Sequence, residues 1–280
     1  FASYYPSRFF DVGIAEQHAV SMAAGMARGG YRPYFAVYST FLQRAYDQIV
    51  HDVCLQNLPV CILSDHVGLV GDDGKTHHGV LSVPMLMSIP NLTLLAPRDT
   101  RQIRQAVRAT LKLDGPCVVQ YPKEGIEPYA QNVTGEPFAV GKWQTLIPGG
   151  QDAVILAYGR MTQNAIQASE LLVRRGLSVG VIDCCSLKPL DMDCLRALFE
   201  RKAKIVTIEE GEMIGGFGSE IARVCVEENA DAPVQIIGLE NRFITHGSVP
   251  ELLRECGLTP EQLANRIEEI AGDKESSHVG

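Results

Sequence analysis

The sequence predicts an α/β protein with two doubly wound domains, each a parallel sheet covered by helices. Short apolar runs alternate with longer helix-like segments along the chain. The alternation is interrupted once, where proline and glycine are frequent and periodicity is lost. We therefore expect a first domain over residues 1–125, a linker over 126–150, a second domain over 151–271 and a disordered polar tail over 272–280.

The first half has the pattern of a parallel sheet. Apolar runs predict strands over residues 9–12, 32–38, 60–64, 92–96 and 117–121. The segments between them predict helices over 15–28, 41–56 and 99–112. A glycine pair ends the first helix, Ser39 or Thr40 can cap the second, and Asp99 begins the third. A long polar loop is left over residues 66–79.

The second half repeats the alternation. Strands are expected over residues 153–158, 178–183, 204–209 and 234–238, and helices over 163–175, 191–199 and 214–228. A further helix begins at about Pro250, and Thr259 can cap another. Because ligands of open α/β sheets bind at the carboxyl ends of strands, we look for chemistry in the loops after Tyr38, Ser64 and Tyr121.

Composition excludes several classes of function. The net charge is −8 and the basic residues are scattered, so we expect no nucleic-acid surface. No apolar run is long enough to span a bilayer and no signal-peptide pattern is present, so we expect no membrane partner and no secretion. The eight cysteines form no C-x-x-C pair and lie mostly in apolar segments, which is typical of reduced thiols in a cytosolic protein.

Glu16 is the first candidate for chemistry. It stands where an apolar segment turns through Gly13 into a helix made largely of alanine and methionine. Burial favours the neutral acid whereas a helix N-terminus favours the anion, so we expect this carboxyl to share a proton with a bound heterocycle. The alternative is a first-turn acid that only satisfies backbone amides.

Three loops supply the remaining candidates. Tyr38 and Phe41 offer an aromatic platform for a flat heterocycle, with Arg44 beside them. An acid with histidines, Asp73 and His77, suits proton transfer. The alternatives are that the aromatic residues belong to the core and that Asp73 only forms a turn with the glycine after it. The histidine pair that begins with His77 matches no structural zinc spacing.

The loop after the last strand of the first half supplies a cation, Lys123. A cation at this edge of the sheet suits a substrate that carries a phosphate.

Three long motifs then carry a resemblance to a known family. Residues 11–30 (DVGIAEQHAVSMAAGMARGG), 38–48 (YSTFLQRAYDQ) and 68–79 (GLVGDDGKTHHG) resemble the pyrimidine-binding domain of the 1-deoxy-D-xylulose-5-phosphate synthase family. The second half is similar to the carboxy-terminal domain of that family through residues 187–191, 209–210, 215–219 and 246–248. The resemblance extends to about residue 270. It implies a transketolase-type pyrimidine-binding domain, incomplete at its start, followed by a transketolase-type C-terminal domain.

The resemblance also implies an activity. Members of this family use thiamine diphosphate to condense pyruvate with glyceraldehyde 3-phosphate, releasing carbon dioxide, for isoprenoid synthesis. Glu16 falls on the catalytic glutamate that contacts the aminopyrimidine, and Phe41 on the aromatic ring that stacks on it, with Tyr38 and Arg44 beside it. Asp73 and His77 fall on the acid and the histidine that face the thiazolium adduct and the acceptor aldehyde.

Two positions depart from the family pattern. His66 and Lys123 stand where the family usually has arginines, which are the expected grip for the acceptor phosphate. An imidazole and an ammonium keep some positive charge but lose the forked geometry of guanidinium. A relative that uses another aldehyde, or that binds phosphate more weakly, stays open.

The family's amino-terminal domain is missing from this sequence. In the family that domain holds Mg²⁺ and the diphosphate through a Gly-Asp-Gly motif, which does not occur here. The chain also begins, at Phe1, as if inside a domain. We therefore expect a fragment that needs an amino-terminal domain or chain as partner, that forms a homodimer, and that works in a bacterial cytoplasm or a plastid stroma.

Two rival functions are kept. One is another enzyme of the same superfamily, either a transketolase or the β subunit of a pyruvate dehydrogenase-type complex. The other is a non-catalytic assembly fragment, because the small residues of the expected helix over residues 15–28, namely Ala15, Ala19, Ala23 and Ala27, suit a close-packed interface as well as an active-site wall.

Overall fold

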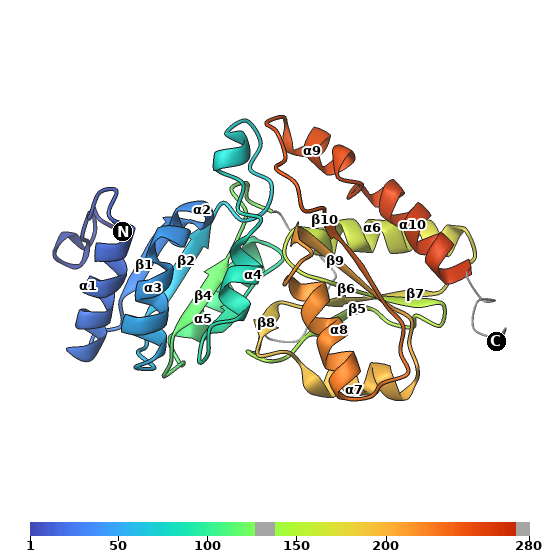
Figure 1. Cartoon of the computed structure of the whole chain (residues 1–280), viewed down its shortest axis with the longest axis horizontal. Coiled ribbons are helices and arrows are strands. Elements are labelled where there is room, and N and C mark those ends of the chain that lie inside the picture. Colours follow the sequence, from blue (N-terminus) through green and yellow to red (C-terminus); the bar gives the residue numbers. More distant parts are fainter. Residues whose placement is uncertain (127–137, 273–280) are drawn as a thin grey trace.

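The structure is a computed structural model that describes residues 1–126 and 138–272. Two α/β units lie side by side along the longest axis of the molecule (Figure 1). Residues 127–137 of the expected linker and nearly all of the expected tail, residues 273–280, lie outside the described residues. The domain boundaries expected from the sequence therefore stay a prediction.

The first sheet has five strands in the order β1-β2-β4-β3-β8. Their bounds are Tyr34–Tyr38 (β1), Cys61–Asp65 (β2), Thr93–Leu95 (β3), Cys117–Gln120 (β4) and Ser186–Lys188 (β8). The first four are parallel, and β8 is antiparallel to β3. The carboxyl ends of β1, β2 and β4 therefore meet at one edge of the sheet, which is where ligands of such sheets bind.

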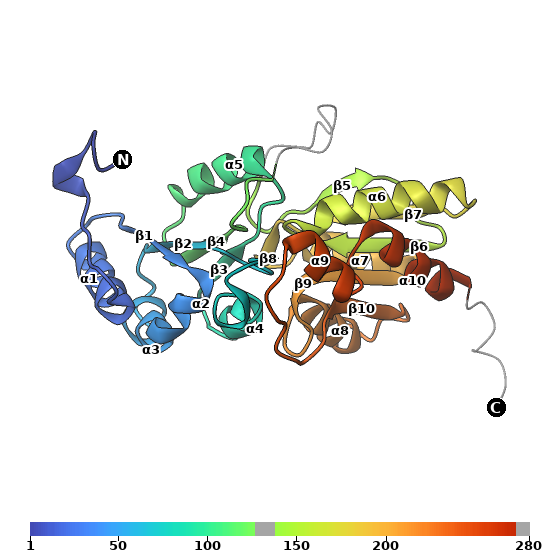
Figure 2. The same cartoon turned by 90° about the horizontal axis from the view of Figure 1, so that it is seen from above.

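Short helices surround this sheet. Their bounds are Glu16–Arg28 (α1), Ser39–Leu42 (α2), Tyr46–Gln48 (α3), Ser82–Met87 (α4) and Thr100–Thr110 (α5). Figure 2 shows α5 on one side of the sheet and α2, α3 and α4 on the other. Asp99 caps α5 as expected, because its side chain accepts a hydrogen bond from the backbone of Gln102.

Three expectations for the first half are corrected. Residues 9–12 do not form a strand: Phe9 and Phe10 are half exposed, and no described strand pairs with this segment. The single helix expected over residues 41–56 is instead a succession of short helical turns that ends in a π-helical segment, Ile49–Cys54. Helix α4 was not expected, because six residues are too few to establish a helical period.

The second sheet has the order β10-β9-β6-β7-β5. Its strands are Gln144–Ile147 (β5), Ala153–Ala157 (β6), Val179–Asp183 (β7), Ile205–Glu212 (β9) and Val234–Leu239 (β10). Its helices are Met161–Arg174 (α6), Met192–Glu200 (α7), Phe217–Glu227 (α8), Val249–Glu255 (α9) and Pro260–Gly272 (α10). In Figure 1, α6 and α10 lie above this sheet and α7 and α8 below it.

The sequence pattern did not predict two of the strands. Strand β5 lies inside the stretch expected to be linker and pairs antiparallel with β7. Strand β8 comes from the second half of the chain but completes the first sheet. One apolar core cluster runs from Leu94 of the first sheet to Val154 and Leu156 of the second, so the two units pack directly against each other.

The long loop between β2 and α4 also reaches the second unit. Leu69, in this loop, is fully buried among the core residues of the second sheet. Gly71 packs against the backbone of Gly247, and Gly74 against His246. The candidate residues on this loop are therefore placed by both units. None of the helices in residues 1–126 and 138–272 has both the length and the apolar character needed to cross a membrane.

Candidate active site

Glu16 begins helix α1, and its side chain is only 8% exposed. The turn before it uses Gly13 at φ +62°, where the backbone N–H bonds the carboxylate of Asp11 at 2.9 Å. Arg44 donates to Glu16 Oε1 from Nη1 across 2.8 Å. In the part of the chain that the structure describes, the second oxygen of Glu16, Oε2, accepts no hydrogen bond. The carboxylate is thus buried, paired on one side and free on the other.

Aromatic rings gather beside this ion pair. The ring of Phe41 stacks on that of Tyr38, with centroids 5.5 Å apart, and meets His77 edge-on at 5.3 Å. The guanidinium of Arg44 lies 5.0 Å from the centroid of Phe41. Arg44 therefore joins the acid of α1 to the aromatic platform that follows β1.

His66 also stacks on Tyr38. The two rings stack with centroids 3.6 Å apart and planes 19° apart. The backbone of His66 is left-handed, at φ +60°, and its N–H donates to Asp65 Oδ1 at 2.6 Å. Its Nδ1 also lies 3.0 Å from that oxygen but makes no hydrogen bond within residues 1–126 and 138–272. The side chain of His66 is 8% exposed, so His66 is a buried ring that packs on Tyr38.

Asp73 and Lys123 form an ion pair at the mouth of this cluster. Lys123 Nζ donates to Asp73 Oδ2 across 3.0 Å, and both side chains are 41% exposed. The hydrogen bond from Lys123 lowers the pKa of Asp73, with smaller contributions from His77 and His66. The same bond raises the pKa of Lys123. The pair is therefore charged at neutral pH.

The loop over residues 66–79 is closed at its base by backbone pairing. Gly68 and Gly79 exchange two hydrogen bonds, of 3.2 and 2.8 Å. A Cβ at position 79 would lie 2.2 Å from the carbonyl oxygen of His66, so only glycine fits there. Near the tip, Thr40 donates to the carbonyl of Thr76 at 3.2 Å. This bond ties the loop to helix α2.

The eight residues singled out from the sequence thus form a contact group of six and a neighbouring ion pair, Asp73–Lys123, at the carboxyl edge of the first sheet. They are Glu16, Tyr38, Phe41, Arg44, His66, Asp73, His77 and Lys123. Sequence reasoning missed Arg160, although it lies just beyond the carboxyl end of β6, where the same rule about strand ends would have placed it. The chemical roles of the eight predicted site residues stay a prediction.

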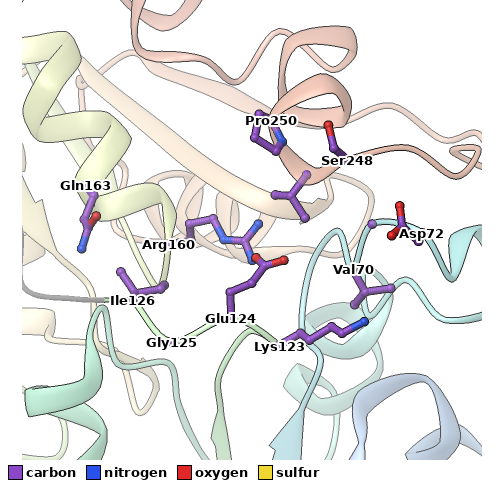
Figure 3. Close-up of a pocket in the computed structure, with 12 residues that line it drawn as sticks. Val70, Asp72, Lys123, Glu124, Gly125, Ile126, Arg160, Gln163, Ser248 and Pro250 are labelled. Atoms are coloured by element: carbon purple, nitrogen blue, oxygen red, sulfur yellow. The ribbon is translucent and has the colours of Figure 1, made fainter.

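A cleft of about 610 Å³ adjoins the Asp73–Lys123 pair and lies between the two units. Figure 3 shows Arg160, Glu124 and Lys123 in succession across the lower part of the cleft, with Ser248 and Asp72 toward the upper right. Among the described residues, no group of three or more His, Cys, Asp or Glu side chains could hold a metal ion. All eight cysteines are free.

The sequence matches two protein families in succession. Residues 1–127 match the transketolase pyrimidine binding domain, and residues 141–263 match the transketolase C-terminal domain. Among solved structures, a chain of a split-gene transketolase is 30% identical with a TM-score of 0.87, and the match covers 97% of this chain and 86% of that one. The chain belongs to the transketolase family. Transketolase from Campylobacter jejuni, at 18% identity and a TM-score of 0.78 over 93% of this chain and 39% of that one, shares the fold.

Within this family, the chain is similar over its whole length to proteins named as synthases. The chain is 43% identical over its whole length to the 1-deoxy-D-xylulose-5-phosphate synthase of Bacillus velezensis, and 44% identical over 98% of its length to that of Geobacillus thermodenitrificans. It spans 44% of the length of each of these relatives.

Proposed function

We propose that this chain is part of a thiamine diphosphate-dependent transferase that condenses pyruvate with glyceraldehyde 3-phosphate to 1-deoxy-D-xylulose 5-phosphate, with loss of carbon dioxide. The product is a precursor of isoprenoids in the methylerythritol phosphate pathway. The observation that carries the proposal is the buried carboxylate of Glu16, paired with Arg44 beside the ring of Phe41. The similarity to synthases over the whole chain supports it.

The residues present fit the pyrimidine end of the cofactor. Phe41 offers an aromatic ring for stacking, and Glu16 has one carboxylate oxygen that accepts no hydrogen bond from the described residues. We infer that Phe41 stacks on the pyrimidine and that Glu16 Oε2 shares a proton with a ring nitrogen. When bound, the cofactor supplies a nucleophilic thiazolium carbon and accepts the negative charge left by decarboxylation. Arg44 holds Glu16 in place for this exchange.

We assign the acceptor aldehyde to the part of the site that is formed by the loop over residues 66–79. His77, edge-on to Phe41, can donate a proton to the aldehyde oxygen, and Asp73 can orient the substrate hydroxyls. Lys123 is exposed enough to meet a phosphate. His66 is buried under Tyr38, so within this proposal its contribution to phosphate binding is the weaker one.

The diphosphate and Mg²⁺ are assigned to an amino-terminal domain, on this chain or a separate one, in an assembly built on a homodimer. The split-gene transketolase that this chain resembles is an inactive β4 tetramer. It supports the inference that a polypeptide of these two domains needs its partner to turn over. The curated relatives named above are bacterial proteins, which favours a cytoplasmic location over a plastid stroma.

A transketolase, or a β subunit of a pyruvate dehydrogenase-type complex, is the second candidate. The 30% identity to the split-gene transketolase favours a transketolase, and the 43% identity to synthases favours our proposal. A non-catalytic assembly fragment would share the fold without the chemistry.

The decisive assay combines the chain with its amino-terminal diphosphate-binding part. We expect carbon dioxide and 1-deoxy-D-xylulose 5-phosphate from pyruvate and glyceraldehyde 3-phosphate. Ketose and aldose phosphates without pyruvate should give no exchange. The chain alone should show no tight binding of thiamine diphosphate and Mg²⁺ in isothermal titration calorimetry. Two-carbon transfer between sugars with no use of pyruvate would contradict the proposal.

A further inference from the structure

We propose that Arg160, in the second unit, is a positioning residue for the two loops that carry Asp73 and Lys123, because its guanidinium joins the carboxylates of Glu210 and Glu124. Its effect on turnover depends on the proposed function. Its effect on the loops does not.

The first contact of Arg160 is with Glu210 of β9. Arg160 Nη1 donates to Glu210 Oε1 across 3.2 Å, and both side chains are buried, at 11% and 8% exposure. The same oxygen accepts the backbone N–H of Leu69 at 2.9 Å. A Cβ at Gly68 would lie 2.6 Å from the Glu210 carboxyl carbon, so the loop backbone rests directly on this carboxylate. Glu210 thereby anchors the loop four residues before Asp73.

The second contact is with the segment that follows β4. Arg160 Nη2 donates to Glu124 Oε2 across 3.0 Å. Glu124 is the neighbour of Lys123, whose amine pairs with Asp73. Figure 3 shows the side chains of Arg160 and Glu124 turned toward each other beside the cleft, with Lys123 extending away toward Val70. Arg160, at the start of α6, therefore links Glu210 to Glu124. Through Glu210 it reaches the loop that carries Asp73, and through Glu124 it reaches the segment that carries Lys123.

The positive charge of Arg160 neutralises the buried carboxylate of Glu210. Burial raises the pKa of Glu210, and Arg160 acts in the opposite direction. Without Arg160, Glu210 would be a buried carboxylate supported by one backbone N–H, and it would either bind a proton or turn toward solvent. Either change weakens its hold on Leu69.

Other anchors of the loop do not depend on Arg160. The side chain of Leu69 is buried in the second core. His78 accepts the N–H of Val70 at Nδ1 over 3.1 Å, and its Nε2 lies 3.1 Å from the carbonyl of Thr245, to which it donates. Loss of Arg160 should therefore shift the loop by a small distance and leave it docked. Small displacements of catalytic groups are sufficient to lower rates strongly.

The structural test is hydrogen exchange on the whole chain, comparing Arg160→Met with Arg175→Met. Arg175 follows the other end of α6 and pairs with Glu268 at 2.6 Å, away from the site. We expect amides in residues 66–79 and 121–126 to exchange about tenfold faster in Arg160→Met, with β6 and β7 unchanged. Arg175→Met should exchange like wild type in both segments. Unchanged exchange in residues 66–79, or an increase spread evenly over the second sheet, would overturn the proposal.

Two further variants keep the proposal testable if Arg160→Met does not fold. Glu124→Gln changes a half-exposed side chain and should loosen residues 121–126 alone. Glu210→Gln keeps an acceptor for Leu69 but removes the charge, and should loosen residues 66–79 alone. Loosening of both segments to the same extent in both variants would contradict the two separate contacts.

The kinetic test uses the enzyme assembled with its diphosphate-binding part. Arg160→Met should lower kcat/KM for the acceptor aldehyde about tenfold, with the KM for pyruvate unchanged. Arg160→Lys should recover part of the loss, because an ammonium keeps the charge without the fork. Wild-type kinetics in Arg160→Met would overturn the positioning role. If the wild-type assembly makes no 1-deoxy-D-xylulose 5-phosphate, the proposed function fails, and hydrogen exchange still decides the effect on the loops.

Discussion

Arg44 donates a hydrogen bond across 2.8 Å to Glu16, whose carboxylate is otherwise enclosed at the start of α1. The same guanidinium lies over the ring of Phe41. A single side chain therefore fixes the distance between the acid and the aromatic platform, which come from segments more than twenty residues apart. A charge-assisted hydrogen bond is stronger and more directional than a neutral one, so this contact sets the geometry of the site.

Arg44→Met should destabilise the chain by about 1 kcal/mol, because it leaves a buried carboxylate without its partner while the lost arginine was half exposed. Urea unfolding measures this. The matched control is Arg28→Met, an exposed arginine in the last turn of α1, which should change stability by less than about 0.5 kcal/mol. Equal effects from the two substitutions would show that the Glu16 pair contributes nothing.

Phe41→Ala should weaken binding of thiamine diphosphate to the assembled enzyme by about tenfold, because it removes the stacking surface. Phe41→Tyr keeps the ring and should bind like wild type. Cofactor titration followed by activity or calorimetry gives both constants. An alanine variant that binds as tightly as the tyrosine variant would exclude Phe41 as the platform.

Lys123→Met should raise the pKa of Asp73, because the ammonium is the main cause of its lowered value. The acid limb of activity should move to higher pH in this variant. Carboxyl carbon NMR of the chain alone measures the pKa without any need for turnover. Lys75→Met, an exposed lysine in the same loop, is the control and should leave the titration of Asp73 in place. If the pKa of Asp73 is the same in Lys123→Met as in wild type, the ion pair does not form in solution.

Glu209 should make the protein less stable as pH rises. Burial raises the pKa of this carboxyl from 4.5 to about 7, although Phe217 and Gly218 donate backbone N–H groups to it. Tyr158 and Glu212 are the other titratable groups that face it. The folded chain holds the proton at pH values where the unfolded chain has lost it, so the contribution to stability is complete below pH 4.5 and is lost as pH approaches 7.

The loss over that window is about 3 kcal/mol. Urea unfolding at several pH values should show it, and Glu209→Gln should abolish this part of the slope. Glu200→Gln, an exposed carboxylate on α7, should keep the slope. A slope that survives Glu209→Gln would assign the effect to another group.

Local rules were sufficient for much of the fold. Apolar runs located most of the strands, and the rule about strand ends placed the aromatic pair after β1 and Lys123 after β4 on the same edge. The Asp99 cap was also predictable, because a cap is a contact between near neighbours.

Long-range partners could not be predicted from local patterns. Strand β8 pairs with the first sheet although it belongs to the second half of the chain, and nothing in a three-residue run specifies its partner. The left-handed backbone that turns His66 under Tyr38 is rare outside glycine and has no local signal. The pairing of Arg160, which follows β6, with Glu210, which lies in β9, depends on the completed sheet.

We propose that Glu16 performs the proton exchange with the pyrimidine ring. The most direct measurement is the rate of 1-deoxy-D-xylulose 5-phosphate formation by the assembled enzyme carrying Glu16→Gln, which keeps the side-chain size but cannot exchange the proton. We predict a loss of at least about 100-fold in kcat. A Glu16→Gln enzyme that turns over at the wild-type rate would contradict the claim.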